Sequence, residues 1–208
     1  MQFIRKRRFL RKKMRVENLK KTFEMLKKEY GKEDLLRDEL IRRSRVVVKL
    51  SKRIIYSVHR NDLKSASEAI TKIKKEVAKI KSLTKSKVSD VGYLRNAFQE
   101  YVEAICFYEF IKNKKIPTNK NLGVDVDSYL LGICDLTGEL MRYATNNFIN
   151  KRFNIVVEVR DLMNFVYDEL MLFDFRSGEL RNKFDSIKYS VKKLNDLVID
   201  IMKLEDKK

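Results

Sequence analysis

The stretch VDSYLLGICDLTGELMRYATNN, from Val126 to Asn147, decides the fold. As a helix it is apolar around most of its circumference, and such a helix is usually buried. Its apolar positions are Tyr129, Leu130, Leu131, Ile133, Leu136, Leu140 and Met141. One polar seam recurs at three- and four-residue spacing and therefore shares one face: Ser128, Gly132, Asp135, Glu139, Arg142 and Asn146. The pattern predicts a buried helix that carries two acids, Asp135 and Glu139, on its polar seam.

A second aromatic-rich stretch, DVGYLRNAFQEYVEAICFYEFI at residues 90–111, carries two more acids on its expected packing face, Glu100 and Glu103. If the two helices meet, the four carboxylates converge. Carboxylates that close cannot all ionise unless protons or metal ions compensate their charge. Because the candidate ligands are all oxygens, we expect Mg²⁺ at this point, with Mn²⁺ as the alternative.

Apolar periodicity predicts five further helices, at residues 16–30, 32–59, 63–81, 152–173 and 179–204. We place the end of the first at Gly31 and expect a loop at residues 112–125, which contain Pro117 and Gly123. The inward stripe of the third consists of Ala66, Ala69, Ile70, Ile73, Val77 and Ile80. The predicted fold is all-α, with seven helices in a single domain.

The chain is strongly basic, with a formal net charge of +18 and a pI of about 9.8. Such a balance predicts affinity for polyanions, most commonly nucleic acid, and the alternative is a lysine-rich solvated surface of the thermophile kind. Residues 1–13 hold seven basic residues and no acid. We interpret them as a basic N-terminal extension that contacts phosphates, followed by a helical domain at residues 14–208.

Other features limit the chemistry and the compartment. No apolar run is long enough to span a bilayer and no signal-peptide core is present, so we expect no membrane partner and a cytoplasmic location. Cys106 and Cys134 are expected to be buried. The single histidine, His59, excludes histidine-rich zinc and di-iron sites. We expect it to pack or cap, with a general base as the alternative.

Four segments resemble the translin family. Residues 129–142, YLLGICDLTGELMR, resemble its signature helix, and residues 100–104, EYVEA, resemble the translin-associated factor X branch, the catalytic subunit of the RNase C3PO. Residues 51–60, SKRIIYSVHR, and 180–189, LRNKFDSIKY, agree. The resemblance covers residues 37–201 and implies a seven-helix subunit of a closed octamer. It also implies that the carboxylates of this branch cut single-stranded RNA with magnesium.

Carried over residue by residue, the resemblance assigns catalysis and metal binding to Glu100, Glu103, Asp135 and Glu139. We place Lys52 and Arg142 nearest the scissile phosphate; the alternative is that they only neutralise the carboxylates. The predicted function is therefore a Mg²⁺-dependent endoribonuclease acting on single-stranded RNA, with DNA left open. Its rival is a non-catalytic nucleic-acid-binding scaffold.

The same resemblance and the composition together predict the assembly. A compact, lysine-rich chain suits an archaeal homologue that forms a homo-octamer better than a subunit of a hetero-octamer. Apolar residues beyond what one small domain can cover also predict a large homo-oligomer, among them Phe148, Phe153, Phe165, Phe173 and Phe175.

Overall fold

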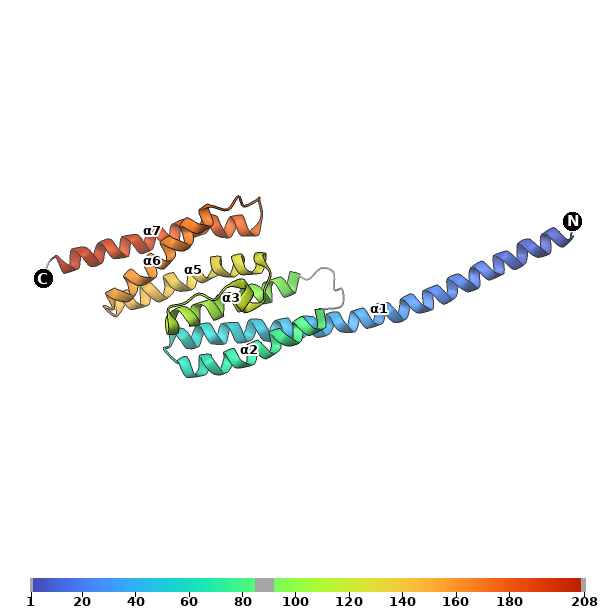
Figure 1. Ribbon diagram of the computed structural model, residues 1–208, viewed down its shortest axis with the longest axis horizontal. Helices are drawn as coiled ribbons and strands as arrows, with labels where there is room; N and C mark the ends of the chain where they lie inside the picture. Colours follow the sequence, from blue (N-terminus) through green and yellow to red (C-terminus); the bar gives the residue numbers. More distant parts are fainter. Residues whose placement is uncertain (1, 85–91, 207–208) are drawn as a thin grey trace. The chain divides into compact units, whose positions relative to one another are not determined.

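The structure, a computed structural model, describes the backbone of residues 2–84 and 92–206, and their side chains except those of residues 2–13, 15 and 205. These residues form seven helices and no strand, which confirms the all-α prediction (Figure 1). The helices are α1 (Gln2–His59), α2 (Leu63–Thr84), α3 (Gly92–Asn113), α4 (Asn119–Leu122), α5 (Val126–Ile149), α6 (Phe153–Met171) and α7 (Glu179–Glu205). No helix in this described part is long and apolar enough to cross a membrane.

The chain divides into two compact units, Met1–Arg42 and Arg43–Lys208. The first is helical along its described backbone, and the side chains of the basic block at residues 1–13 lie outside the described residues. The first two residues of the predicted helix at 90–111 also lie outside them.

Helix α1 corrects one sequence prediction. The predicted end at Gly31 is wrong, because α1 continues through this residue and joins the predicted helices 16–30 and 32–59 into one. A glycine inside a helix costs only about 1 kcal/mol relative to alanine, and the residues around Gly31 are mostly good helix formers. A Cβ atom at Gly31 would meet nothing within 4 Å, so no tertiary contact requires a glycine there.

A short helix corrects a second prediction. Residues 112–125, predicted to be a loop, contain the single-turn helix α4. Thr118 and Asn121 form a reciprocal capping box at its start, and Gly123 ends it in the left-handed conformation at φ 64°. These local hydrogen bonds satisfy the backbone groups of one turn, which apolar periodicity cannot reveal over four residues.

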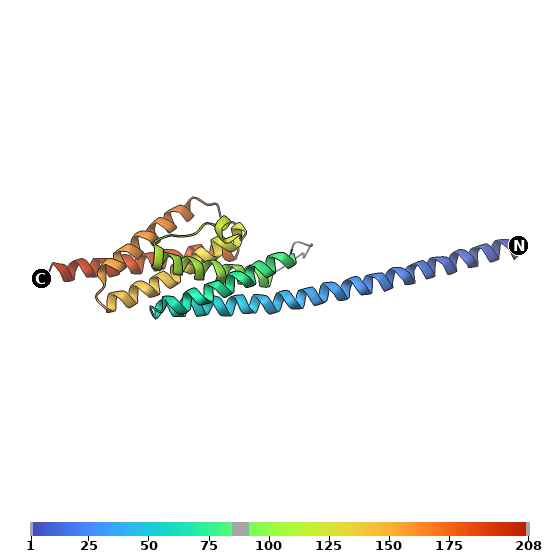
Figure 2. The same cartoon turned by 60° about the horizontal axis from the view of Figure 1, so that its bottom comes forward.

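Helix α5 lies at the centre of the second unit. It packs against α3, α6 and α7, while α3 also contacts α2 (Figures 1 and 2). The buried residues of α2 are the six predicted from its stripe. Both cysteines are buried and form no disulfide, as expected. The helix whose sequence is apolar around most of its circumference therefore packs against three others.

Helices α3 and α5 approach each other closely at Gly132. A Cβ atom there would lie 2.6 Å from Val102 Cβ and 2.7 Å from the backbone oxygen of Gln99. Because both neighbours belong to the packed surface of α3, they cannot move away without separating the helices. The absence of a side chain at Gly132 thus sets how closely the acidic segments of α3 and α5 approach each other.

We predict that Gly132→Ala lowers the free energy of unfolding by about 1–3 kcal/mol, because the added methyl group overpacks the α3–α5 contact. The matched control is Gly138→Ala on the same helix, where a Cβ atom meets nothing within 4 Å. This control should hold or raise stability, since alanine favours a helix by about 1 kcal/mol over glycine. Thermal denaturation of both variants is the measurement, and an equal effect of the two substitutions would contradict the prediction.

Candidate functional site

A pocket of about 200 Å³ opens beside the crossing of α3 and α5. It is lined by Lys52, Ile55, Tyr56, Glu100, Glu103, Glu139 and Arg142. The lining residues come from the second unit's part of α1, from α3 and from α5. The structure thus brings together three of the four predicted carboxylates and both predicted cations.

Asp135 does not line the pocket, and it has two polar partners of its own. Lys183 Nζ donates to Asp135 Oδ1 at 2.5 Å, and Gln99 Nε2 donates to Asp135 Oδ2. The charge of Asp135 nevertheless raises the pKa of Glu100 and Glu103, so it belongs to the same electrostatic cluster. Lys183 brings α7 to this cluster.

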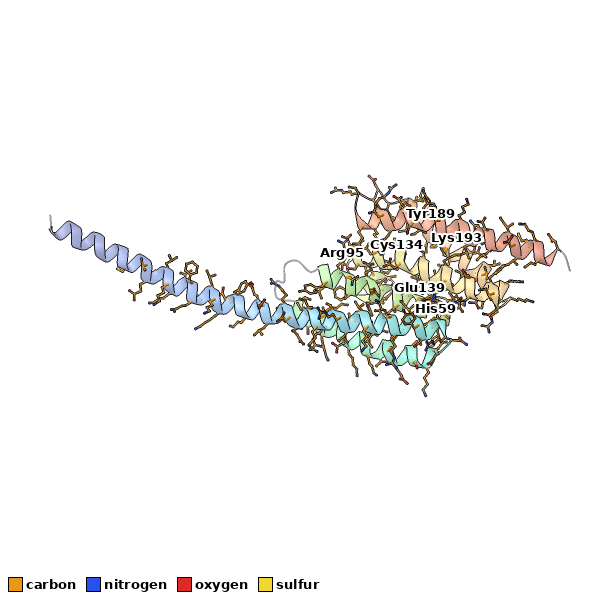
Figure 3. All side chains as sticks on the ribbon, turned by 180° about the vertical axis from the view of Figure 1, so that it is seen from behind. His59, Arg95, Cys134, Glu139, Tyr189 and Lys193 are labelled. Carbon is orange, nitrogen blue, oxygen red and sulfur yellow. The ribbon has the colours of Figure 1, made fainter. Side chains whose placement is uncertain are left out.

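Glu139 is held by His59 and Arg142. His59 Nε2 lies 2.5 Å from Glu139 Oε2, and the two side chains meet in Figure 3. The His59 side chain is 6 % exposed, and its ring packs against Phe107 with 4.9 Å between centroids. Arg142 lies 3.6 Å from the same Glu139 oxygen. His59 therefore packs as expected, and it also orients a carboxylate of the cluster.

Burial and mutual repulsion raise the pKa of both acids of α3. Burial, together with the charges of Asp135, Glu100 and Glu139, raises the pKa of Glu103 to about 8. Burial also raises the pKa of Glu100, although Lys52 opposes the shift. Positive charge at this point is therefore insufficient to ionise all four acids at neutral pH.

The donor set suits a hard divalent cation, but the carboxylates do not form a ready chelate. Among the described residues, no three acidic, cysteine or histidine side chains are arranged to hold a metal ion. The physical reason is that Asp135 is turned toward Lys183 and Gln99, and Glu139 toward His59. Each carboxylate oxygen has further lone pairs, so these partners leave acceptor capacity for an ion.

Sequence reasoning missed three polar contributors to this cluster: Gln99, Lys183 and the contact of His59 with Glu139. Lys183 lies within residues 180–189, which carry part of the family resemblance, but spacing along α7 does not reveal what it faces. Gln99 directly precedes Glu100, but a neutral amide beside a carboxylate gives no signal in the sequence that it contacts Asp135. All three contacts join elements that are distant in sequence.

The fold and the pocket define a class of all-helical proteins in which two packed helices present carboxylates to a cavity flanked by basic side chains. The model of the translin family matches residues 35–202 of this chain. This chain belongs to the translin family, and the resemblance of its sequence segments is confirmed.

Relatives come from both branches of the family. An uncharacterised protein of Methanocaldococcus jannaschii is 30 % identical over 177 residues, which cover 83 % of this chain and 79 % of that protein. The translin-associated protein X homologue of Schizosaccharomyces pombe is 30 % identical over 129 residues, covering 53 % of this chain and 55 % of that protein. Human translin is 28 % identical over 82 residues, covering 39 % and 36 %.

Solved structures share the fold. The crystal structure of apo-NeC3PO has a TM-score of 0.81 at 30 % identity, covering 85 % of this chain and 95 % of that chain. The crystal structure of AfC3PO has a TM-score of 0.78 at 25 % identity, covering 86 % and 95 %. The architecture of the second unit is therefore that of the C3PO subunits.

We predict that the parent protein loses stability as the pH rises from about 4.5 toward 8 in EDTA. The pKa of Glu103 rises from 4.5 to about 8 on folding, so the folded state binds the extra proton between these values. The free energy of unfolding must then fall with pH in this window, by an amount on the order of a few kcal/mol. Glu103→Gln, which stays neutral, should flatten the fall in melting temperature.

The control for this experiment is Glu68→Gln, at an exposed position on α2. Its carboxylate is in water in both states, so the pH dependence should match that of the parent. A Glu103→Gln variant with the parent's full slope would show that Glu103 is not the group responsible.

Proposed function

We propose that this chain is the catalytic subunit of a Mg²⁺-dependent endoribonuclease that cleaves single-stranded RNA. The observation that carries the proposal is the pocket at the α3–α5 crossing, which three acids line together with Lys52 and Arg142. Acids grouped in this way cost stability, because the cations beside them offset only part of their mutual repulsion. A divalent cation would supply the missing charge.

The cation would be held by Glu100, Glu103 and Glu139, which line one pocket, and by Asp135 beside them. When bound, such an ion lowers the pKa of its bound water and offsets the charge that develops on the phosphate. Because the pKa of Glu103 is about 8, this side chain would release its proton on binding a cation. Mn²⁺ offers the same ligand chemistry and is the alternative ion.

The remaining polar side chains orient the carboxylates and bind phosphate. His59 fixes one oxygen of Glu139, and Lys183 and Gln99 fix Asp135. Lys52 is exposed and lines the pocket, which suits a direct contact with a phosphate. Arg142 already pairs with Glu139 and is half exposed, so it can contact a phosphate while it remains beside the acid.

Affinity for nucleic acid is supported by the formal net charge of +18 and by family membership. AfC3PO, a structural neighbour, has been solved as a complex with duplex RNA. The second candidate function is a non-catalytic nucleic-acid-binding scaffold of the translin type. What favours it is that no three acids are arranged to hold a metal ion in the described part of the chain.

We further propose that the chain acts as a homo-octamer. Phe165 is 62 % exposed on α6 and Phe173 follows it, 48 % exposed, whereas Phe148 and Phe153 are partly covered. Phe175 instead packs on Phe184 at 5.4 Å between ring centroids. Large apolar side chains left in water on one helix and its end are typical of an interface between subunits.

We predict that Mg²⁺ produces cleavage of labelled single-stranded RNA and that EDTA abolishes it. Glu100→Gln and Glu103→Gln should each lower the cleavage rate on the order of 100-fold or more, because each removes charge from the proposed metal site. Glu103→Gln should not lower the melting temperature, since the amide mimics the protonated acid. Glu68→Gln should cleave as the parent does.

Asp135→Asn adds a structural comparison to the cleavage assay. It removes the anionic partner of Lys183, so its melting temperature should fall together with its cleavage rate. If Glu100→Gln and Glu103→Gln cleave like the parent, the carboxylate cluster is not the active site. If the parent binds RNA and does not cleave it in Mg²⁺ or Mn²⁺, the scaffold is the correct function.

We predict that RNA binding in EDTA weakens steeply with salt. Each phosphate that a lysine or arginine neutralises releases a counterion, so the logarithm of the binding constant should fall linearly with the logarithm of the salt concentration. Fluorescence anisotropy across a salt series measures the slope. An affinity that is the same at low and moderate salt would mean that basic side chains do not form the binding surface.

We predict that light scattering gives a mass near eight times the subunit mass of 24.8 kDa. Phe165→Glu should shift the mass toward smaller species, because it places a charge within an apolar contact. A mass of one subunit for the parent at micromolar concentration would rule out the octamer.

A further inference from the structure

We infer that Tyr56 is a stacking platform for an unpaired nucleobase at the mouth of the acidic pocket. The inference rests on the proposed function and adds a subsite for the base to a site so far described through its charges. The ligand class is a single-stranded nucleotide whose base is not stacked within a duplex. No role for Tyr56 follows from the sequence, where it is one apolar residue within residues 51–60.

The exposure of Tyr56 is the first observation. It lines the pocket with Glu100, Glu103 and Glu139, and it is 55 % exposed. Its neighbours Ile55 and Val58 are buried, so the backbone of α1 is fixed at this point while the ring stays accessible. An aromatic ring held on a rigid helix and left in water presents a flat apolar surface beside the acids.

The position of Arg142 is the second observation. Its guanidinium lies 5.9 Å from the centroid of the Tyr56 ring and 3.6 Å from Glu139 Oε2. One arginine therefore links the aromatic surface to the acidic cluster. Arginine also stacks on aromatic faces and contacts phosphates, so ring and guanidinium can hold a base and its backbone together.

The register of Lys52 is the third observation. Lys52 and Tyr56 are four residues apart on α1, and residues at this spacing lie on the same face of a helix. A nucleotide whose base stacks on Tyr56 therefore has a cation one helical turn away for its phosphate, at the edge of the same pocket. Stacking on protein requires a base that has left its own neighbours, which favours single strands over duplexes.

The test compares two ligands on matched variants. Fluorescein-labelled RNA and an abasic ribose-phosphate oligomer of equal length are titrated in EDTA, where no cleavage competes with binding. The parent should bind the RNA about 10-fold or more tightly than the abasic oligomer. Tyr56→Leu should lose most of this preference, while Tyr56→Phe, which keeps the ring, should retain it.

Tyr189 is the matched control. It is 63 % exposed on α7 and carries a cation over its ring, with Lys188 Nζ 5.1 Å from the centroid, but it does not line the pocket (Figure 3). Tyr189→Leu should therefore keep the parent's preference for RNA. Because Tyr189 shares exposure and a nearby cation with Tyr56, the comparison isolates the position beside the acids.

Each outcome decides the matter. A parent without preference for RNA over the abasic oligomer overturns the inference whatever the variants do. An unchanged preference in Tyr56→Leu, or an equal loss in Tyr189→Leu, also overturns it. Because binding is measured without metal, a failed cleavage assay beside an intact Tyr56 effect would refute the nuclease and leave the stacking subsite standing.

Discussion

The close approach of α3 and α5 is the contact on which the rest of the second unit depends. Gly132 lets the two helices pack with backbone against side chain, and Val102 and Gln99 occupy the space where a Cβ atom would lie. The approach that buries the apolar faces also brings Glu100 and Glu103 beside Asp135 and Glu139. The close approach of α3 and α5 therefore both stabilises the core and produces the repulsion among the carboxylates.

Cations and protons together balance only part of the negative charge of the cluster. Lys183 and Gln99 donate hydrogen bonds to Asp135, and His59 and Arg142 contact Glu139. Burial and the neighbouring acids nevertheless raise the pKa of Glu103 to about 8. A proton bound to Glu103 relieves part of the repulsion among these acids.

Four elements meet at this cluster, and each supplies a different type of group. Helices α3 and α5 supply the acids, α7 supplies Lys183, and α1 supplies Lys52, Tyr56 and His59. Of the residues that line the pocket, Glu103 is buried and Glu100 and Glu139 are partly buried, whereas Lys52, Tyr56 and Arg142 are exposed. The exposed cations beside these acids lower the negative potential of the pocket.

The sequence by itself determined the all-α fold, the buried stripe of α2 and the presence of acids on two largely apolar helices, because apolar periodicity records which face of each helix avoids water. That these two helices pack against each other was decided by the tertiary structure. The sequence did not predict that α1 continues through Gly31 or that residues 112–125 contain a short helix. Neither a glycine within a helix nor a four-residue capping box changes the apolar periodicity of the sequence. Only the tertiary structure decided that Asp135 faces Lys183, that His59 reaches Glu139, and that Tyr56 stays exposed beside them. The two contacts join residues 48 and 80 positions apart, and their geometry follows from helix packing, which spacing along one helix does not encode.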